Sequence, residues 1–330
     1  MKRLLLSTAI ALTLLSLIAG SVEVYWRQRG YTPGIIDSTD LWAQQRDRLR
    51  HSDKRPLALL GASRTVYNID LPTLRQRLPD YQPVMLAIDA NPAIATLRDL
   101  AHDRQFDGVV LCDIDGLGLW RVAWELQQPY VLHYHRQWTI SRDLHRRLLS
   151  FWQRHAVIAR SDFSLVRSLV RQWNGEPEPF HPYLWLDELR AGFIDFSRTD
   201  PTAHRRELEA HLAQYHGQLP HAPIEAWRAD LAQIKTWVSA IQQRGGNVIF
   251  YATPISGLRH QVEEQTYPRA LYWDQLGPAT GAPTLHADDV PALRDFPLAD
   301  ESHIDYHDKV RYTNLLIDAL NERGWLPPRS

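Results

Sequence analysis

Short runs of consecutive apolar residues recur along the chain from residue 56 onward, and each ends in small or polar residues. The runs lie at 57–60, 84–88, 109–112 and 248–251. Continuous apolar runs of this length are typical of central strands in a parallel sheet, because both faces of such a sheet are buried. The pattern therefore predicts buried parallel strands at these positions.

The segments between these runs show helical spacing. Apolar residues recur along one face over 93–102 and over 226–244, and a last helix is expected over about 306–323. Strands that alternate with helices predict a doubly wound α/β domain. Residues 117–225 interrupt the alternation, are rich in Trp, Arg and His, and are expected to form a mainly helical insertion.

The N-terminus has the pattern of a membrane segment. Lys2 and Arg3 precede an uncharged run over 4–22, which Glu23 ends. At about 1.5 Å per residue, a helix of this length nearly spans a hydrocarbon core of about 30 Å. The basic pair favours a cytoplasmic N-terminus and export of the rest of the chain. The alternative is a signal peptide that is cleaved after export, since Ala19-Gly20-Ser21 offers small residues for cleavage.

The chain is thus expected to have an anchor or signal segment over 1–22, a polar stalk over 23–55 and an α/β domain over 56–330. Lys and Arg number 37, and Asp and Glu number 38. With no basic excess, a dedicated nucleic-acid binder is excluded. A single cysteine, Cys112, excludes an intramolecular disulfide and a Cys-based zinc cluster, and neither a metal nor a cofactor is expected.

Candidate chemistry lies where the predicted strands end, since open α/β sheets bind ligands at the carboxyl ends of their strands. Gly61-Ala62-Ser63-Arg64 follows the first run, and Asp300-Glu301-Ser302-His303 precedes the last helix. A serine hydroxyl is a weak nucleophile unless a base activates it. A histidine can supply the base, and an aspartate three residues earlier can hold its tautomer. The pattern predicts Ser63, Asp300 and His303 as a catalytic set.

This arrangement resembles the SGNH (GDSL-like) hydrolase superfamily, and more narrowly its membrane-anchored bacterial branch. The narrower likeness rests on the Gly-Ala-Ser-Arg turn, on Trp26–Tyr31 beside the anchor and on Pro268–Asp274. The resemblance implies a three-layer α/β/α, flavodoxin-like fold with a central parallel sheet. It also implies an oxyanion hole formed by the backbone N–H groups of Ser63 and Ala90, with Asn91 as a further donor.

The chain departs from the family pattern after the third strand. The family's Gly-x-Asn-Asp is absent, and Asp113-Ile114-Asp115-Gly116 stands there instead. The side-chain donor that the Asn supplies is therefore missing, a loss that typically costs about 100- to 1000-fold in rate. Arg64 is expected to bind an anionic group of the substrate, and Asp113 and Asp115 to bind substrate hydroxyls.

The resulting hypothesis is an exported, membrane-anchored serine esterase or O-acyltransferase that acts on acylated glycans of the cell envelope. A membrane-embedded acyltransferase is a possible partner. The alternative is a non-catalytic envelope protein that keeps the fold and binds a glycan or a membrane partner.

Overall fold

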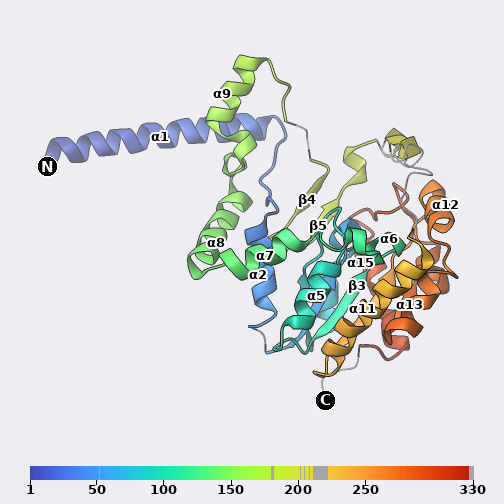
Figure 1. Ribbon diagram of the computed structural model, residues 1–330. Coiled ribbons are helices and arrows are strands. Elements are labelled where there is room, and N and C mark those ends of the chain that lie inside the picture. Colours follow the sequence, from blue (N-terminus) through green and yellow to red (C-terminus); the bar gives the residue numbers. More distant parts are fainter. Residues whose placement is uncertain are drawn as a thin grey trace.

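A five-stranded parallel sheet forms the centre of the computed structural model (Figure 1), which describes residues 1–51, 53–179, 182–200, 202–203, 205–207, 209–210 and 222–326. The strand order is β2-β1-β3-β6-β7, and every neighbouring pair is parallel. The strands are β1 (Arg55–Leu60), β2 (Tyr81–Met85), β3 (Val109–Asp113), β6 (Asn247–Ala252) and β7 (Thr284–His286). The sequence pattern misses β7, whose three residues are too few for an apolar run.

Helices cover both faces of the sheet, so the predicted three-layer α/β/α fold is confirmed. Along β1, Ala58 and Leu60 face one core and Leu57 and Leu59 the other, which is the two-residue period of a strand. The first core is closed by α5 (Ile94–His102), α11 (Ile224–Gln242) and α13 (Trp273–Thr280). The second is closed by α3 (Ser63–Asn68), α4 (Leu71–Arg77) and α15 (Lys309–Glu322).

The remaining helices of the domain range from 4 to 16 residues in length. They are α2 (Thr39–Arg48), α6 (Gly116–Leu119), α7 (Gln128–Gln137), α8 (Ile140–His155), α9 (Leu165–Asn174), α12 (Gly257–Thr266) and α14 (Pro291–Arg294). Single 3₁₀ turns are η1 (Arg121–Ala123), η2 (Val157–Ala159), η3 (Ser161–Phe163), η4 (Phe196–Arg198) and η5 (Ala287–Asp289).

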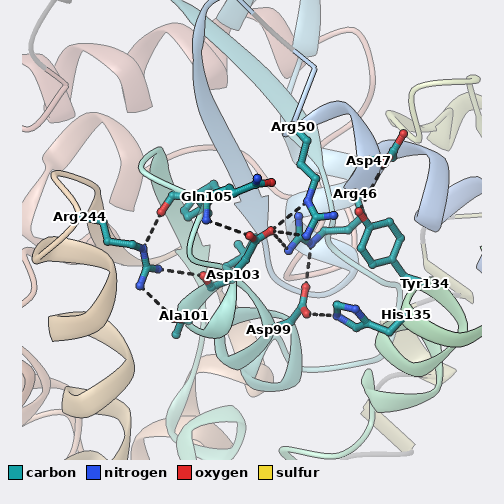
Figure 2. Close-up of polar contacts among 12 residues, drawn as sticks. Arg46, Asp47, Arg50, Asp99, Ala101, Asp103, Gln105, Tyr134, His135 and Arg244 are labelled. Carbon is teal, nitrogen blue, oxygen red and sulfur yellow. Dashed lines mark hydrogen bonds and ion pairs between the residues drawn. The ribbon is translucent and has the colours of Figure 1, made fainter.

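Helix α2 packs against the domain, which differs from the stalk expected over residues 23–55. Leu41 and Trp42 are fully buried, and the Trp42 ring N–H donates to the carbonyl of Leu86 at 2.9 Å. Arg46 is also fully buried and pairs with Asp99 and Asp103 of the α5 region at 2.7 and 2.8 Å (Figure 2). The charged residues of this segment therefore conceal a buried face that composition alone does not indicate. The domain boundaries themselves stay predictions.

The expected insertion over 117–225 is mainly helical in the part that the structure describes, which excludes 211–221. It holds α6 to α9 and a short antiparallel pair that the pattern did not predict, formed by β4 (Leu184–Leu186) and β5 (Gly192–Ile194). This pair lies near the end of the chain, because the Tyr306 N–H donates to the carbonyl of Ile194 at 2.8 Å.

Helix α1 (Lys2–Gln28) projects away from the domain as a single rod (Figure 1). It is long and apolar enough to cross a membrane, and its apolar window is not buried against other residues. A signal sequence has the same features, so the helix agrees with either a signal anchor or a signal peptide.

Candidate active site

The turns after β1 and β2 lie side by side at the carboxyl edge of the sheet. The Ile88 N–H donates to the carbonyl of Gly61 at 3.1 Å, which continues the strand pairing beyond the ends of both strands. The buried amide of Gln127 joins the two turns, because it donates to the carbonyls of Gly61 and Asn91 at 3.1 and 2.8 Å. Gln127 was not recognised in the sequence, since it lies in the insertion and matches no motif.

The first turn places Ser63 at the start of α3. Gly61 has φ +150°, and a Cβ built on it would lie 2.2 Å from Oγ1 of Thr65. The Thr65 hydroxyl in turn bonds to the carbonyl of Leu60 at 3.2 Å. The turn therefore needs glycine at 61, and Ser63 stands partly exposed at the first position of the helix.

Asp300 and His303 form the hydrogen-bonded pair that their spacing predicts. His303 Nδ1 lies 2.8 Å from Asp300 Oδ2, and the His303 backbone N–H donates to Oδ1 at 2.7 Å. Burial by itself would raise the pKa of Asp300. The hydrogen bonds from His303 and from the Ser302 backbone outweigh it and hold this pKa well below its usual range. An ionised Asp300 keeps the proton on Nδ1, which leaves Nε2 as the basic nitrogen.

The loop that carries this pair is fixed on both sides. The Asn68 side chain, at the end of α3, donates to the carbonyl of Ser302 and accepts from the Ile304 N–H. Glu301 has φ +71°, and its carboxylate accepts the Arg259 N–H in the first turn of α12 at 3.0 Å. A carboxylate at a helix N-terminus is stabilised by the helix dipole. Asn68 and Glu301 therefore position the pair, a role that no sequence motif indicated.

His303 Nε2 is buried and has no hydrogen-bond partner among the described residues. The His303 ring meets the Tyr67 ring edge-on, with 6.1 Å between centroids. Tyr67 lies four residues after Ser63 on α3, so the two side chains share a helix face. The structure thus brings the histidine to the face of α3 on which Ser63 lies, without a hydrogen bond between them. Hydrogen bonds of this type are often long before substrate binds.

The second turn offers the other expected oxyanion donor. Ala90 has φ +58°, a conformation that glycine adopts most easily. Its N–H is bonded to the carboxylate of Asp89, whose pKa is raised by partial desolvation. The side-chain amide of Asn91 donates to the Asp89 carbonyl at 2.7 Å. Any oxyanion at Ala90 must therefore displace the Asp89 carboxylate, and one N–H of Asn91 is engaged within the turn.

Arg64, Asp113 and Asp115 contact one another. The Arg64 guanidinium lies 3.3 Å from Asp113 Oδ2 and 3.2 Å from Asp115 Oδ2, and Arg64 and Asp113 are buried. Burial raises the pKa of Asp113, while the charge of Arg64 opposes that rise. Asp115 also caps α6 through the Gly118 N–H at 2.8 Å. Asp113 Oδ2 is nevertheless buried without a hydrogen-bond partner among the described residues. The expected role of these three residues as substrate ligands stays a prediction.

Glu263 of α12 adds a third carboxylate to this cluster. Burial and the charge of Asp115 raise the pKa of Glu263 to about 7, although Arg64 and Arg259 lower it. Between about pH 4.5 and 7, Glu263 therefore keeps a proton in the folded protein that it loses in the unfolded chain. The contribution of Glu263 to the free energy of unfolding thus falls as the pH rises through this range.

We expect Glu263→Gln to remove this fall in unfolding free energy with rising pH. Urea unfolding at pH 5.5 and at pH 8.5 gives the difference in unfolding free energy between the variant and the native chain. This difference should grow in favour of the variant by about 1–3 kcal/mol from pH 5.5 to pH 8.5. Glu264→Gln, on the same helix but exposed, is the control and should show no such gain. A difference between Glu263→Gln and the native chain that does not change with pH would contradict the assignment.

No family model matches the sequence, and no curated protein is similar to it. Among solved structures, the chain is similar to a crystal structure of TesA, with a TM-score of 0.34 and 10% sequence identity. The match covers 81% of this chain and 99% of that one.

Proposed function

We propose that this protein is an SGNH-like serine esterase or O-acyltransferase that acts on acyl esters. The observation that carries the proposal is Nε2 of His303, which is buried without a partner in the part of the chain that the structure describes. Asp300 holds the His303 ring beside the face of α3 that begins at Ser63. A buried ring nitrogen without a partner is costly, and a catalytic role explains its retention.

In the proposed reaction, Ser63 Oγ attacks the acyl carbonyl while His303 Nε2 takes the hydroxyl proton. Asp300 stabilises the imidazolium that forms. The N–H groups of Ser63 and Ala90 bind the oxyanion as Asp89 turns away. The imidazolium then protonates the leaving alcohol, and an acyl ester remains on Ser63. Water or a sugar hydroxyl then attacks this ester while Nε2 takes its proton. The imidazolium returns that proton to Ser63 Oγ as the free acid or the new ester leaves, so hydrolysis and transfer share one intermediate.

We further propose that α1 anchors the enzyme in the inner membrane, with its N-terminus inside and the domain exported. An O-acylated glycan of the cell envelope is then the substrate, and a membrane acyltransferase a partner. The support is the basic pair before the apolar run and the projection of α1 from the domain (Figure 1).

Turnover of nitrophenyl acetate by the full chain in detergent tests the activity. We expect measurable hydrolysis that Ser63→Ala abolishes. Ser256→Ala is the matched control, because Ser256 is an exposed serine before α12 whose side chain makes no cap bond. Mass spectrometry of the products formed in the presence of an oligosaccharide acceptor distinguishes transfer from hydrolysis, because transfer gives an acetylated oligosaccharide and hydrolysis gives free acetate.

A non-catalytic binding protein is the second candidate. Two observations favour it. The Asp89 carboxylate accepts the Ala90 N–H that an oxyanion would need, and the carboxylate of Asp113 lies where the SGNH superfamily has an amide donor. A folded chain with no turnover, whose affinity for an acetylated glycan is unchanged by Ser63→Ala, is the outcome expected for this candidate.

A further inference from the structure

The buried side chains of helices α8 and α9 are polar, and their large apolar side chains are exposed beside other polar ones. On α8 the buried side chains are Arg146, Ser150 and Gln153, which bond to one another at 2.6–3.0 Å. On α9 the buried residue is Arg171. Helices on a protein surface in water have the opposite arrangement.

The outward faces carry large apolar residues at helical spacing. Those of α9 lie at i, i+3, i+4 and i+7, and they are Val166, Leu169, Val170 and Trp173. Those of α8 lie at i, i+4, i+8, i+11 and i+12, and they are Ile140, Leu144, Leu148, Phe151 and Trp152. Trp173 and Ile140 are each 91% exposed. A continuous apolar face of this kind marks a surface that is covered in use.

Both helices are fixed to the end of α1 at the level where its apolar run stops. The Glu23 carboxylate accepts the N–H groups of Val157 and Ile158, each at 3.0 Å, just after α8 ends. Arg27 donates to the carbonyl of His155 at 2.8 Å. The Trp26 ring is buried against Phe163, just before α9 begins.

The two helices run across α1 and not along it (Figure 1). They also lie on the side of the domain from which α1 leaves. If α1 spans a bilayer, α8 and α9 therefore lie along its surface. Helices in this position bury their apolar face about 5–10 Å into the boundary between headgroups and acyl chains, and tryptophan is favoured there.

We propose that the outward faces of α8 and α9 dock on the lipid surface around α1 and hold the domain against the membrane. This inference rests on the membrane anchor proposed above. It explains the inverted polarity of the two helices, which an anchor that merely tethers the domain would not require.

The test places an environment-sensitive NBD fluorophore on single cysteines in the full chain, reconstituted in phosphatidylcholine–phosphatidylglycerol vesicles. The labelled positions are Trp173→Cys and Trp152→Cys. Val310→Cys, an apolar position on α15 that is half exposed, is the matched control. The native Cys112 is buried. We expect lipids brominated in the acyl chain to remove more than half of the fluorescence at 173 and 152 and none at 310.

Equal, weak quenching at all three positions would overturn the proposal. A blue shift of the NBD emission that brominated lipids do not quench would also overturn the proposal if it disappears when the protein is diluted in the vesicles. The apolar faces of α8 and α9 would then be covered by a second copy of the chain. Alkaline carbonate extraction tests the anchor separately. Protein that leaves the vesicles would refute the anchor, whereas retained but unquenched protein would refute only the docking.

Discussion

Replacing His303 with alanine is expected to lower kcat for ester hydrolysis by about 10²- to 10⁴-fold. The reason is the loss of the base, because Nε2 of His303 is the basic nitrogen on the Ser63 face of α3. Residues that act as one catalytic unit are not additive. The double variant Ser63→Ala/His303→Ala should therefore lose no more activity than the more damaging of the two single variants. Initial rates with nitrophenyl acetate check both expectations.

His307→Ala is the matched control for this prediction. His307 lies four residues further along and also pairs with a carboxylate, since its Nδ1 is 2.6 Å from Asp305 Oδ1. Its side chain is exposed and lies outside the proposed site. An equal loss of activity in His307→Ala, or no loss in His303→Ala, would contradict the proposed base.

Replacing Arg46 with alanine is expected to destabilise the fold by about 3–5 kcal/mol, the cost of removing the buried partner of two buried carboxylates. Arg46 is fully buried and bonds to both Asp99 and Asp103 (Figure 2). Asp99 keeps one further partner, His135, at 2.5 Å. Urea unfolding of the full chain in detergent measures the change.

Arg50→Ala provides the comparison within the same cluster. Arg50 also pairs with Asp103, at 3.0 Å, but its side chain is partly exposed. Exposed ion pairs contribute about 0–1 kcal/mol, so the expected loss is small. Equal losses for Arg46→Ala and Arg50→Ala would show that burial does not govern the strength of this cluster.

The sheet could be predicted from the sequence because its central strands are buried on both faces and leave continuous apolar runs. The structure has strands at all four predicted positions, and within the central sheet it adds the short edge strand β7. The packing of α2 against the domain could not be predicted from the sequence, for the opposite reason. Arg46 is charged, and only its partners Asp99 and Asp103, distant in the chain, make its burial possible.

The site was predictable where residue type and local spacing carry the chemistry. Asp300 and His303 are three residues apart, and the structure pairs them as expected. The groups that hold the site together act through backbone contacts across long sequence separations. Gln127 and Asn68 are of this kind, and no local pattern distinguishes them from other amides.

The expected ligands Arg64, Asp113 and Asp115 show a further limit of sequence reasoning. Their position at strand ends was correct, but their side chains turn to one another. Whether a polar group at such an edge faces the ligand or a neighbouring charge depends on rotamers that composition does not determine. Both carboxylates are held by Arg64.

Labelling of the full chain by a fluorophosphonate, with the modified residue located by peptide mass, tests the central claim most directly. The probe reacts only with an activated serine. The proposed mechanism predicts a single adduct on Ser63 that is lost in Ser63→Ala, falls sharply in His303→Ala and persists in Ser256→Ala. A folded protein that never labels, or an adduct on another serine, would contradict it.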